Sequence, residues 1–239
     1  MSPYKQEDVL LKAVLGRKPE KRLLNTIYSS KAAELVVIYG RRWVGKTYLI
    51  KHYFQPKRGI YFQITGIKNG ALGVQLNRYT KVLGETFYPD ISIQTPATWM
   101  AAFDELTKAI NKLPQSKKVV LFFDELPWLA NRKSGVLQAI EYFWNRYWVD
   151  DKRLKLILCG SSSSWMINKI IKNRGGLHNR VTKKIRLMPF TLEESRVFLE
   201  HQNITLSKKL LLKLYTHRLS RCEIMTNSFV RDKSFWSDE

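Results

Sequence analysis

The sequence predicts an α/β protein of three layers, in which a mostly parallel β-sheet lies between two layers of helices. The first observation behind this prediction is a set of three apolar runs, at residues 35–39, 119–123 and 154–159, separated by helix-compatible stretches. Strands of a parallel sheet are buried on both faces, so they are apolar along their whole length. The second observation is a glycine-rich stretch after the first run, and the third is a pair of carboxylates after the second.

The first run leads directly into a glycine-rich loop and then into a helix-compatible stretch at residues 48–54. Glycines let a backbone approach a phosphate closely, and the N–H groups at the start of a helix attract an anion. The order of strand, loop and helix therefore predicts a phosphate-binding loop for a nucleotide. The loop fits the pattern G-x-x-x-x-G-K-[ST] and reads Gly40-Arg41-Arg42-Trp43-Val44-Gly45-Lys46-Thr47.

The polar residues of this loop have expected parts in binding a nucleotide and Mg²⁺. Lys46 supplies a positive charge to the β- and γ-phosphates, and Thr47 supplies a hydroxyl ligand to Mg²⁺. The other loop residues present backbone N–H groups to the anion, and Tyr48 begins the helix-compatible stretch. We therefore expect the nucleotide to contact the chain from Gly40 to Tyr48.

A weaker strand candidate lies at residues 59–64, and two later stretches carry apolar side chains at helical spacing. These are residues 99–110 and residues 137–148. Both contain several aromatic residues, and helical periodicity favours packing of their rings in the core over a platform for stacked bases.

The second apolar run ends in two carboxylates, Asp124 and Glu125. Ligands of an open parallel sheet lie at the carboxyl ends of its strands. Asp124 is therefore expected to hold Mg²⁺ through a water molecule, opposite Thr47. Glu125 is expected to orient or deprotonate the water that attacks the γ-phosphate. Two acidic residues at a strand end are a weak signal alone and a strong one together with the loop.

The third apolar run ends in Gly160 and four serines. A serine hydroxyl at this strand end could form a hydrogen bond to the γ-phosphate or to the attacking water; the alternative is the N-cap of a helix, where serine is favoured. Farther on, Arg180 stands just before a strand-like stretch at residues 181–187. Arg180 could neutralise charge in the transition state, or it could be a surface arginine in a basic segment.

With 239 residues, of which 44% are hydrophobic, the chain can bury the core of one domain, and disorder along most of it is excluded. The apolar runs are much shorter than the roughly 20 residues that a membrane-spanning helix needs. The first residues are charged where a signal peptide is apolar, so we expect a cytoplasmic protein without a membrane partner. Cys159 is expected to be a small buried hydrophobe, and the four histidines form no zinc-binding pattern.

The chain carries 41 lysines and arginines against 20 aspartates and glutamates, a formal net charge of +21. This excess favours a polyanionic partner, either a nucleic acid or, less readily, an anionic membrane surface. Ten of the basic residues, and no acidic residue, lie from Lys152 to Arg186. The alternative is a solvated basic face on a protein that already binds an anionic nucleotide.

Four stretches, taken in order, resemble the archaeal-type ATPases of bacteria and archaea, which belong to the AAA+ superfamily and lie close to its signal-transducing (STAND) branch. Two shorter pieces resemble the family's N-terminal G-R-x-x-E motif and the P-F-x-x-x-E start of its helical lid. The four stretches are 40–47, 122–129 (FFDELPWL), 158–165 (LCGSSSSW) and 175–180 (GGLHNR), and the two pieces are 15–20 (LGRKPE) and 188–193 (MPFTLE).

The resemblance covers about residues 15–215 and implies binding and Mg²⁺-dependent hydrolysis of ATP. It implies the parts described above for Asp124 and Glu125, and a sensor role for Ser161. It implies an arginine-finger or sensor role for Arg180, with self-association if Arg180 acts in trans. It also implies that Arg17, in the N-terminal motif, lies near the nucleotide.

The resemblance also suggests how the chain is divided. We expect a lead-in at residues 1–30, a P-loop ATPase core at 31–190 and the start of a helical lid at 191–215. Residues 216–239 diverge from the family and show neither helical periodicity nor a strand pattern. We expect this tail to be disordered and the lid to be truncated.

The leading interpretation is an ATP-dependent switch or ATPase that acts on or near nucleic acid. The main alternative is a module that binds ATP and hydrolyses little of it, as expected if the lid is incomplete. A GTPase would carry an Asn-Lys-x-Asp motif, and the Asn-Lys pairs at 111–112 and 168–169 lack the aspartate. For a small-molecule kinase, no substrate-binding motif accompanies the loop.

Overall fold

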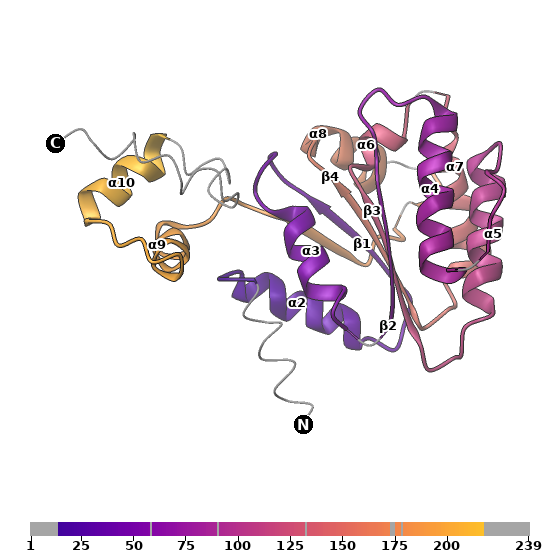
Figure 1. Ribbon diagram of the computed structural model, residues 1–239, viewed down its shortest axis with the longest axis horizontal. Coiled ribbons are helices and arrows are strands. Elements are labelled where there is room, and N and C mark those ends of the chain that lie inside the picture. Colours follow the sequence, from indigo (N-terminus) through magenta and orange to yellow (C-terminus); the bar gives the residue numbers. More distant parts are fainter. Residues whose placement is uncertain are drawn as a thin grey trace.

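The computed structural model contains a five-stranded parallel sheet with the strand order β2-β3-β4-β1-β5 (Figure 1). The strands lie where the sequence predicts them, so the expected α/β fold is confirmed. The structure describes residues 14–217 except Arg58, Asp90, Arg132, Asn173, Arg174 and His178, and only the backbone of 213–217. The strands are β1 Glu34–Tyr39, β2 Gly59–Thr65, β3 Lys118–Asp124, β4 Leu154–Gly160 and β5 Lys183–Arg186.

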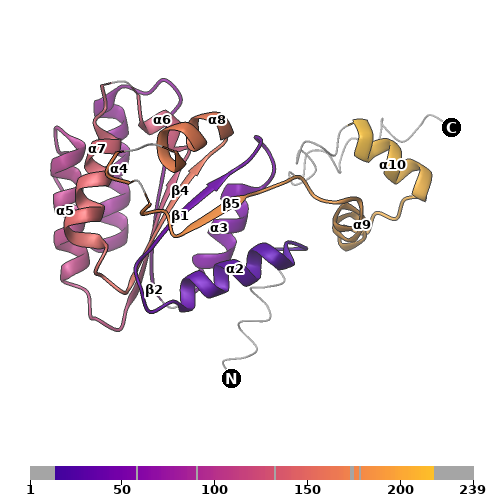
Figure 2. The same ribbon diagram turned by 180° about the vertical axis from the view of Figure 1, so that it is seen from behind.

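Helices connect the strands and cover both faces of the sheet (Figures 1 and 2). Two short π-helical turns, η1 and η2, extend α7 and α8. None of the described helices is long and apolar enough to cross a membrane. The helices are α2 Lys18–Ser29, α3 Lys46–Phe54, α4 Leu72–Phe87, α5 Trp99–Asn111, α6 Leu126–Leu129, α7 Val136–Phe143, η1 Trp144–Trp148, α8 Ser163–Met166, η2 Ile167–Ile171, α9 Leu192–His201 and α10 Lys208–His217.

The central strand β1 shows how the sheet separates two apolar cores. Leu35 and Val37 belong to the core under α4, α5 and α7, and Val36 and Ile38 belong to the core under α2 and α3. All four side chains are fully buried. Side chains of a strand alternate between its two faces, so a strand covered on both sides is apolar at nearly every position.

The aromatic residues of α5 and α7 pack in the core, as helical periodicity predicts. The ring centroid of Phe103 lies 5.9 Å from that of Phe143 and 5.6 Å from that of Trp148. Tyr142 and Tyr147 are exceptions, because each is nearly half exposed. The expected helix over residues 137–148 is α-helical only as far as Phe143 and continues as the π-helical turn η1.

After β5 the chain leaves the sheet and forms the helix pair α9–α10, which lies to one side of it, beyond α3 (Figure 1). The two helices share a small core around Leu199 and Leu211. The expected lid region at 191–215 is thus mostly helical. Thr216 and His217 complete α10, and residues 218–239 of the expected tail, like residues 1–13 of the lead-in, lie outside the described residues.

Candidate nucleotide-binding site

The sheet order brings the three sequence motifs to one edge. Strand β4 lies between β1 and β3, and Tyr39 of β1 is aligned with Gly160 of β4. Phe123 of β3 is aligned with Leu158 of β4. Since all strands are parallel, the segments that follow β1, β3 and β4 emerge at the same, carboxyl edge.

The glycine-rich loop follows β1 and uses both of its glycines for conformations that other residues rarely adopt. Gly40 has φ of 155° and Gly45 has φ of 87°. At Gly40 the backbone also lies against the end of β5, since a Cβ there would stand 2.2 Å from the carbonyl oxygen of Leu187. Gly45 is the N-cap of α3, whose first N–H groups therefore face the loop.

The side chain of Lys46 lies across this loop and is only 5% exposed. Its Nζ donates hydrogen bonds to the carbonyl oxygens of Gly40, at 3.0 Å, and Arg41, at 2.9 Å. The ammonium group is therefore held within the turn of the loop, with helix α3 beginning at the same residue. A positive charge and a helix N-terminus thus act together on any anion that the loop receives.

Thr47 and Asp124 join the loop to the end of β3. The Thr47 hydroxyl donates to Oδ2 of Asp124 at 2.9 Å, although the two residues are 77 positions apart. Asp124 is 2% exposed, and its other oxygen, Oδ1, accepts the backbone N–H of Glu125 at 3.1 Å. These two side chains were predicted to share one cation, and the structure places them in contact.

The environment of Asp124 disfavours its charged form. Burial raises the pKa of Asp124 above its ordinary value, and the neighbouring Glu125 carboxylate acts in the same direction. Hydrogen bonds from Thr47 and Cys159 oppose this shift without cancelling it. A buried carboxylate beside a hydroxyl is an oxygen donor set of the kind that Mg²⁺ prefers, and a cation there would offset the charge of Asp124.

Glu125 is directed to the end of β4 rather than to the loop. Its backbone is left-handed, with φ of 47° and ψ of 49°, and β3 ends at the residue before it. Its Oε2 accepts hydrogen bonds from the backbone N–H of Ser161, at 3.2 Å, and from the Ser161 hydroxyl, at 2.8 Å. The N-cap of α8 is the next serine, Ser162, whose side chain makes no capping hydrogen bond, so the N-cap alternative applies to Ser162 and not to Ser161.

The other residues of the loop face outward or pack beside it. The guanidinium of Arg42 lies 5.1 Å from the ring centroid of Trp128. Trp43 is 59% exposed and has a positive φ of 67°, an uncommon conformation for a bulky residue. The ring of Tyr48 lies against that of His52, with centroids 4.1 Å apart.

Arg17 contacts the backbone of the glycine-rich loop through its side chain. Its Nη2 donates to the carbonyl oxygen of Val44 at 3.0 Å, and its Nη1 donates to the carbonyl oxygen of Met188 at 2.7 Å. The guanidinium lies 4.3 Å from the ring centroid of Phe190, and the residue is 4% exposed. Every one of these contacts is with protein groups, so direct contact with the nucleotide stays a prediction.

Arg180 is not brought to the site of its own chain. It stands before β5, where the N–H of Thr182 donates to the carbonyl oxygen of Leu35 near the start of β1. The loop lies at the other end of these strands, next to Leu187. Strand β5 alone spans roughly 13 Å, so the exposed Arg180 belongs to the opposite, amino edge of the sheet.

Two residues near Asp124 were not anticipated from the sequence. Thr65, at the end of β2, directs its hydroxyl to Oδ2 of Asp124 at 3.4 Å, and it continues a line of polar side chains formed by Tyr61 and Gln63. Cys159 is fully buried, as expected, and contacts Asp124 as well. The alternation of polar residues along β2 is the sequence signal that marks Thr65.

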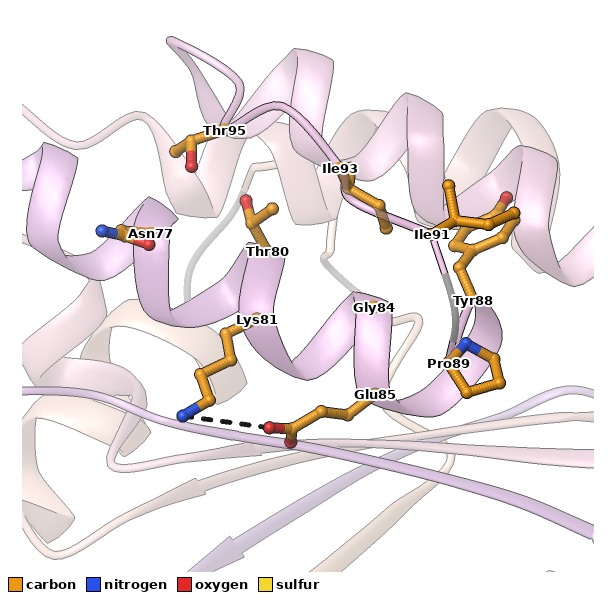
Figure 3. A pocket seen from close by; sticks show the side chains of 10 residues that line it. All are labelled: Asn77, Thr80, Lys81, Gly84, Glu85, Tyr88, Pro89, Ile91, Ile93 and Thr95. Carbon is orange, nitrogen blue, oxygen red and sulfur yellow. Dashed lines mark ion pairs between the residues drawn. The ribbon is translucent and has the colours of Figure 1, made fainter.

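A groove of about 380 Å³ lies away from these motifs, between the second half of α4 and the loop that follows it (Figure 3). Its lining is mixed: Ile91 and Ile93 are apolar, while Lys81 and Glu85 form an exposed ion pair at 4.0 Å. None of the predicted site residues lines it.

Comparison with solved structures shows the same fold in two archaeal proteins. The Walker-type ATPase PABY2304 of Pyrococcus abyssi is similar with a TM-score of 0.57 and 18% identity, over 85% of this chain and 63% of that one. The ORC2 protein of Aeropyrum pernix, solved in complexes with ADPNP and ADP, is similar with a TM-score of 0.59 and 18% identity, over 79% of this chain and 52% of that one.

At the level of sequence, the chain is 26% identical over 184 residues to the uncharacterized protein MJECL04 of Methanocaldococcus jannaschii. That similarity covers 77% of this chain and 38% of the relative. The chain therefore spans less than two thirds of the length of each of these three proteins. Residues 15–210 match a family described as an ATPase domain predominantly from Archaea. The chain accordingly belongs to this family of archaeal-type P-loop ATPase domains.

Proposed function

We propose that this chain binds ATP together with Mg²⁺ and hydrolyses the ATP to ADP and phosphate. The observation that carries the proposal is the 2.9 Å hydrogen bond between Thr47 and Asp124, because it joins the glycine-rich loop to the carboxylate pair. Membership of an ATPase family supports the same activity.

In the proposed complex the β- and γ-phosphates lie in the loop, against Lys46 and the N-terminus of α3. Thr47 would bind Mg²⁺ through its hydroxyl, and Asp124 would bind it through water. Bound there, Mg²⁺ would neutralise charge on the phosphate oxygens. Burial of Asp124 beside Thr47 supports this assignment, since both oxygen donors are already in contact.

Glu125 is the proposed acceptor of the proton. In the reaction the oxygen of a water molecule attacks the γ-phosphorus, the bond from that phosphorus to the ADP oxygen breaks, and Glu125 takes up a proton from the water. Ser161 holds the Glu125 carboxylate at the end of β4. We assign Ser161 the role of keeping this carboxylate in place beside the γ-phosphate.

The test is ATP turnover by the whole chain, measured beside Glu125→Gln and Lys46→Ala. The amide of Glu125→Gln cannot accept a proton, so this variant should bind ATP and turn it over about 10²–10⁴-fold more slowly. Lys46→Ala should lose ATP binding. Normal turnover by Glu125→Gln would contradict the assignment of the base. Tight binding without turnover by the unsubstituted chain would instead favour an ATP-binding module.

Arg180 enters this proposal only through self-association. Because it lies at the amino edge of the sheet, it could reach the γ-phosphate of a neighbouring copy and not that of its own chain. A partner of the same sequence, with the carboxyl edge of one copy against the amino edge of the next, is the arrangement that this role requires.

We also propose nucleic acid as a partner. The observation that favours it is a group of basic residues on β5, an outermost strand of the sheet. Strand β5 is an edge strand of the sheet (Figure 2). Three of its four residues, Lys183, Lys184 and Arg186, are exposed. None of the ion pairs among the described residues includes them. Unpaired cations on an open edge suit the regularly spaced phosphates of a polyanion.

A further inference from the structure

The guanidinium of Arg17 lies where three parts of the molecule meet. It donates to the carbonyl oxygen of Val44 in the phosphate-binding loop and to that of Met188 just after β5. It also stacks on Phe190, two residues before α9 begins. A planar guanidinium with two donor nitrogens in a fixed fork holds two carbonyl groups at a set angle, which a lysine cannot do.

The hydrogen bond to Val44 fixes the direction of a peptide group in the loop. In a trans peptide the C=O and the following N–H point in opposite directions. With the Val44 carbonyl turned toward Arg17, the N–H of Gly45 points away from Arg17. This peptide joins Val44 to Gly45, one residue before Lys46, so Arg17 helps to direct a backbone donor of the loop toward a bound phosphate.

The backbone of Arg17 is tied in turn to the first turn of α9. Its N–H donates to Oε1 of Glu194 at 3.0 Å, and a Cβ on the preceding Gly16 would stand 3.1 Å from the same oxygen. Arg17 itself has a left-handed backbone, with φ of 54° and ψ of 34°. A strained backbone of this kind persists where surrounding contacts hold it, and it is typical of functional sites.

Glu194 is at the same time part of the cap of α9. Its Oε2 accepts the N–H of Thr191 at 3.0 Å, while the Thr191 hydroxyl accepts the N–H of Glu194 at 3.1 Å. Burial alone would raise the pKa of Glu194, but the hydrogen bonds from Thr191 and Arg17 and the charge of Arg17 outweigh it and lower the pKa. One ionised carboxylate therefore links the helix pair to Arg17.

We propose that Arg17 is a positioning residue that couples phosphate binding in the loop to the position of the α9–α10 pair. Nucleotide binding fixes the loop around Val44. The guanidinium of Arg17, held by Val44, then fixes the position of Met188 and Phe190, and the contact between Arg17 and Glu194 fixes the first turn of α9. The inference rests on the proposed function, because it needs the loop to bind a nucleotide.

Coupling between two sites is reciprocal, so a change in α9 must alter the affinity of the loop by the same factor by which the nucleotide stabilises the position of α9. Glu194→Ala tests this, because Glu194 does not touch the loop. Two control variants reproduce the other consequences of Glu194→Ala, which are a weaker helix cap and the loss of a negative charge. Thr191→Ala weakens the same helix cap and leaves the Arg17 contact. Glu193→Ala removes a neighbouring surface charge, which pairs with Arg196.

The first measurement is the dissociation constant of the whole chain for a non-hydrolysable ATP analogue with Mg²⁺. We expect Glu194→Ala to raise this constant about fivefold or more, within the usual range of coupling between sites. Both controls should stay within about twofold, a margin that covers loss of the cap or of charge alone. Equal constants for all three variants would overturn the coupling.

The second measurement is hydrogen exchange of the α9 amides with and without the analogue, which a merely structural role would not make nucleotide-dependent. We expect the analogue to slow this exchange in the unsubstituted chain and in both controls, and to leave it unchanged in Glu194→Ala and in Arg17→Lys. Should Glu194→Ala fail to fold, Arg17→Lys carries the test, since it keeps the charge and loses the fork.

The outcomes separate this inference from the proposed function. If the unsubstituted chain does not bind the analogue, the proposed function is wrong and the inference with it. If the analogue binds and slows exchange in α9 equally in the unsubstituted chain and in Arg17→Lys, ATP binding stands and the coupling through Arg17 is wrong.

Discussion

At the scale of single residues, the two neighbouring carboxylates Asp124 and Glu125 differ in surroundings and therefore in chemistry. Asp124 is the last residue of β3 and is buried between the hydroxyls of Thr47 and Thr65. Glu125 has a left-handed backbone, which turns its side chain toward Ser161. One sequence motif thus supplies a buried carboxylate beside the glycine-rich loop and a second carboxylate that is held at the end of the next strand.

The raised pKa of Asp124 predicts how binding depends on pH. A carboxyl group whose pKa is raised keeps its proton to a higher pH, and the neutral group no longer offers the negative charge that attracts Mg²⁺ and its bound water. Mg²⁺-dependent ATP binding should therefore weaken as the pH falls, beginning above the pH at which an exposed aspartate titrates. The measurement is the dissociation constant for ATP with Mg²⁺ as a function of pH.

Asp124→Asn is the matching variant. It should weaken Mg²⁺-dependent binding about 10–100-fold, as the loss of a group that binds a metal through water does, and abolish this part of the pH dependence.

The stability of the protein without Mg²⁺ should depend on pH in the opposite direction from Mg²⁺-dependent binding. The native state binds more protons than the unfolded state, so the free energy of unfolding falls as the pH rises through the raised pKa. Asp124→Asn should then be the more stable protein at neutral pH. If Asp124→Asn were instead less stable than the unsubstituted chain without Mg²⁺, burial would not be the dominant cause of the raised pKa.

At the scale of secondary-structure elements, the phosphate-binding loop is built against the end of β5. Gly40→Ala should weaken both ATP binding and the fold, because its Cβ would stand 2.2 Å from the Leu187 carbonyl oxygen and φ is 155°. We expect the free energy of unfolding to fall by about 1–3 kcal/mol, as for other overpacked sites. Thermal unfolding and ATP titration measure the two effects.

Gly73→Ala is the control for this prediction. Gly73 lies in the first turn of α4, and a Cβ there would meet nothing within 4 Å. Replacing a helical glycine by alanine should raise the free energy of unfolding by up to about 1 kcal/mol and leave ATP binding unchanged. Similar losses of ATP binding in both variants would show that the contact between the loop and β5 is not the cause.

Elements differed in how well the sequence predicted them, and the reasons are physical. Strands such as β1 are buried on both faces, so their apolar runs are unbroken and easy to identify. Helix α4 was missed although Leu76, Tyr79 and Leu83 recur at helical spacing, because glycines near both of its ends weaken a helical signal. The π-helical turn η1 arises from a shift in backbone hydrogen bonding that no residue pattern announces.

At the scale of the whole molecule, strand order and direction decide which predicted residues meet. Residues that follow parallel strands were predicted to share an edge, and Thr47, Asp124 and Ser161 lie there. The same rule, applied to a residue before a strand, places Arg180 at the opposite edge. The contact of Arg17 with Glu194 could not be predicted in this way, because the two residues are 177 positions apart and neither lies on a strand.

The distribution of charge yields the last prediction, which concerns the exposed basic residues of β5. Two explanations compete: lysines on an edge strand prevent pairing with other chains, and unpaired cations bind phosphates. If nucleic acid binds here, its affinity should fall steeply with salt and show little sequence preference. Lys183→Ala and Lys184→Ala should each lower the salt slope by about 1, while Lys81→Ala, on α4 and paired with Glu85, should leave it unchanged. Fluorescence anisotropy with labelled duplex DNA and single-stranded RNA over a salt series measures these slopes. Equal slopes for all three variants, or no binding at low salt, would leave protection of the edge as the explanation of these residues.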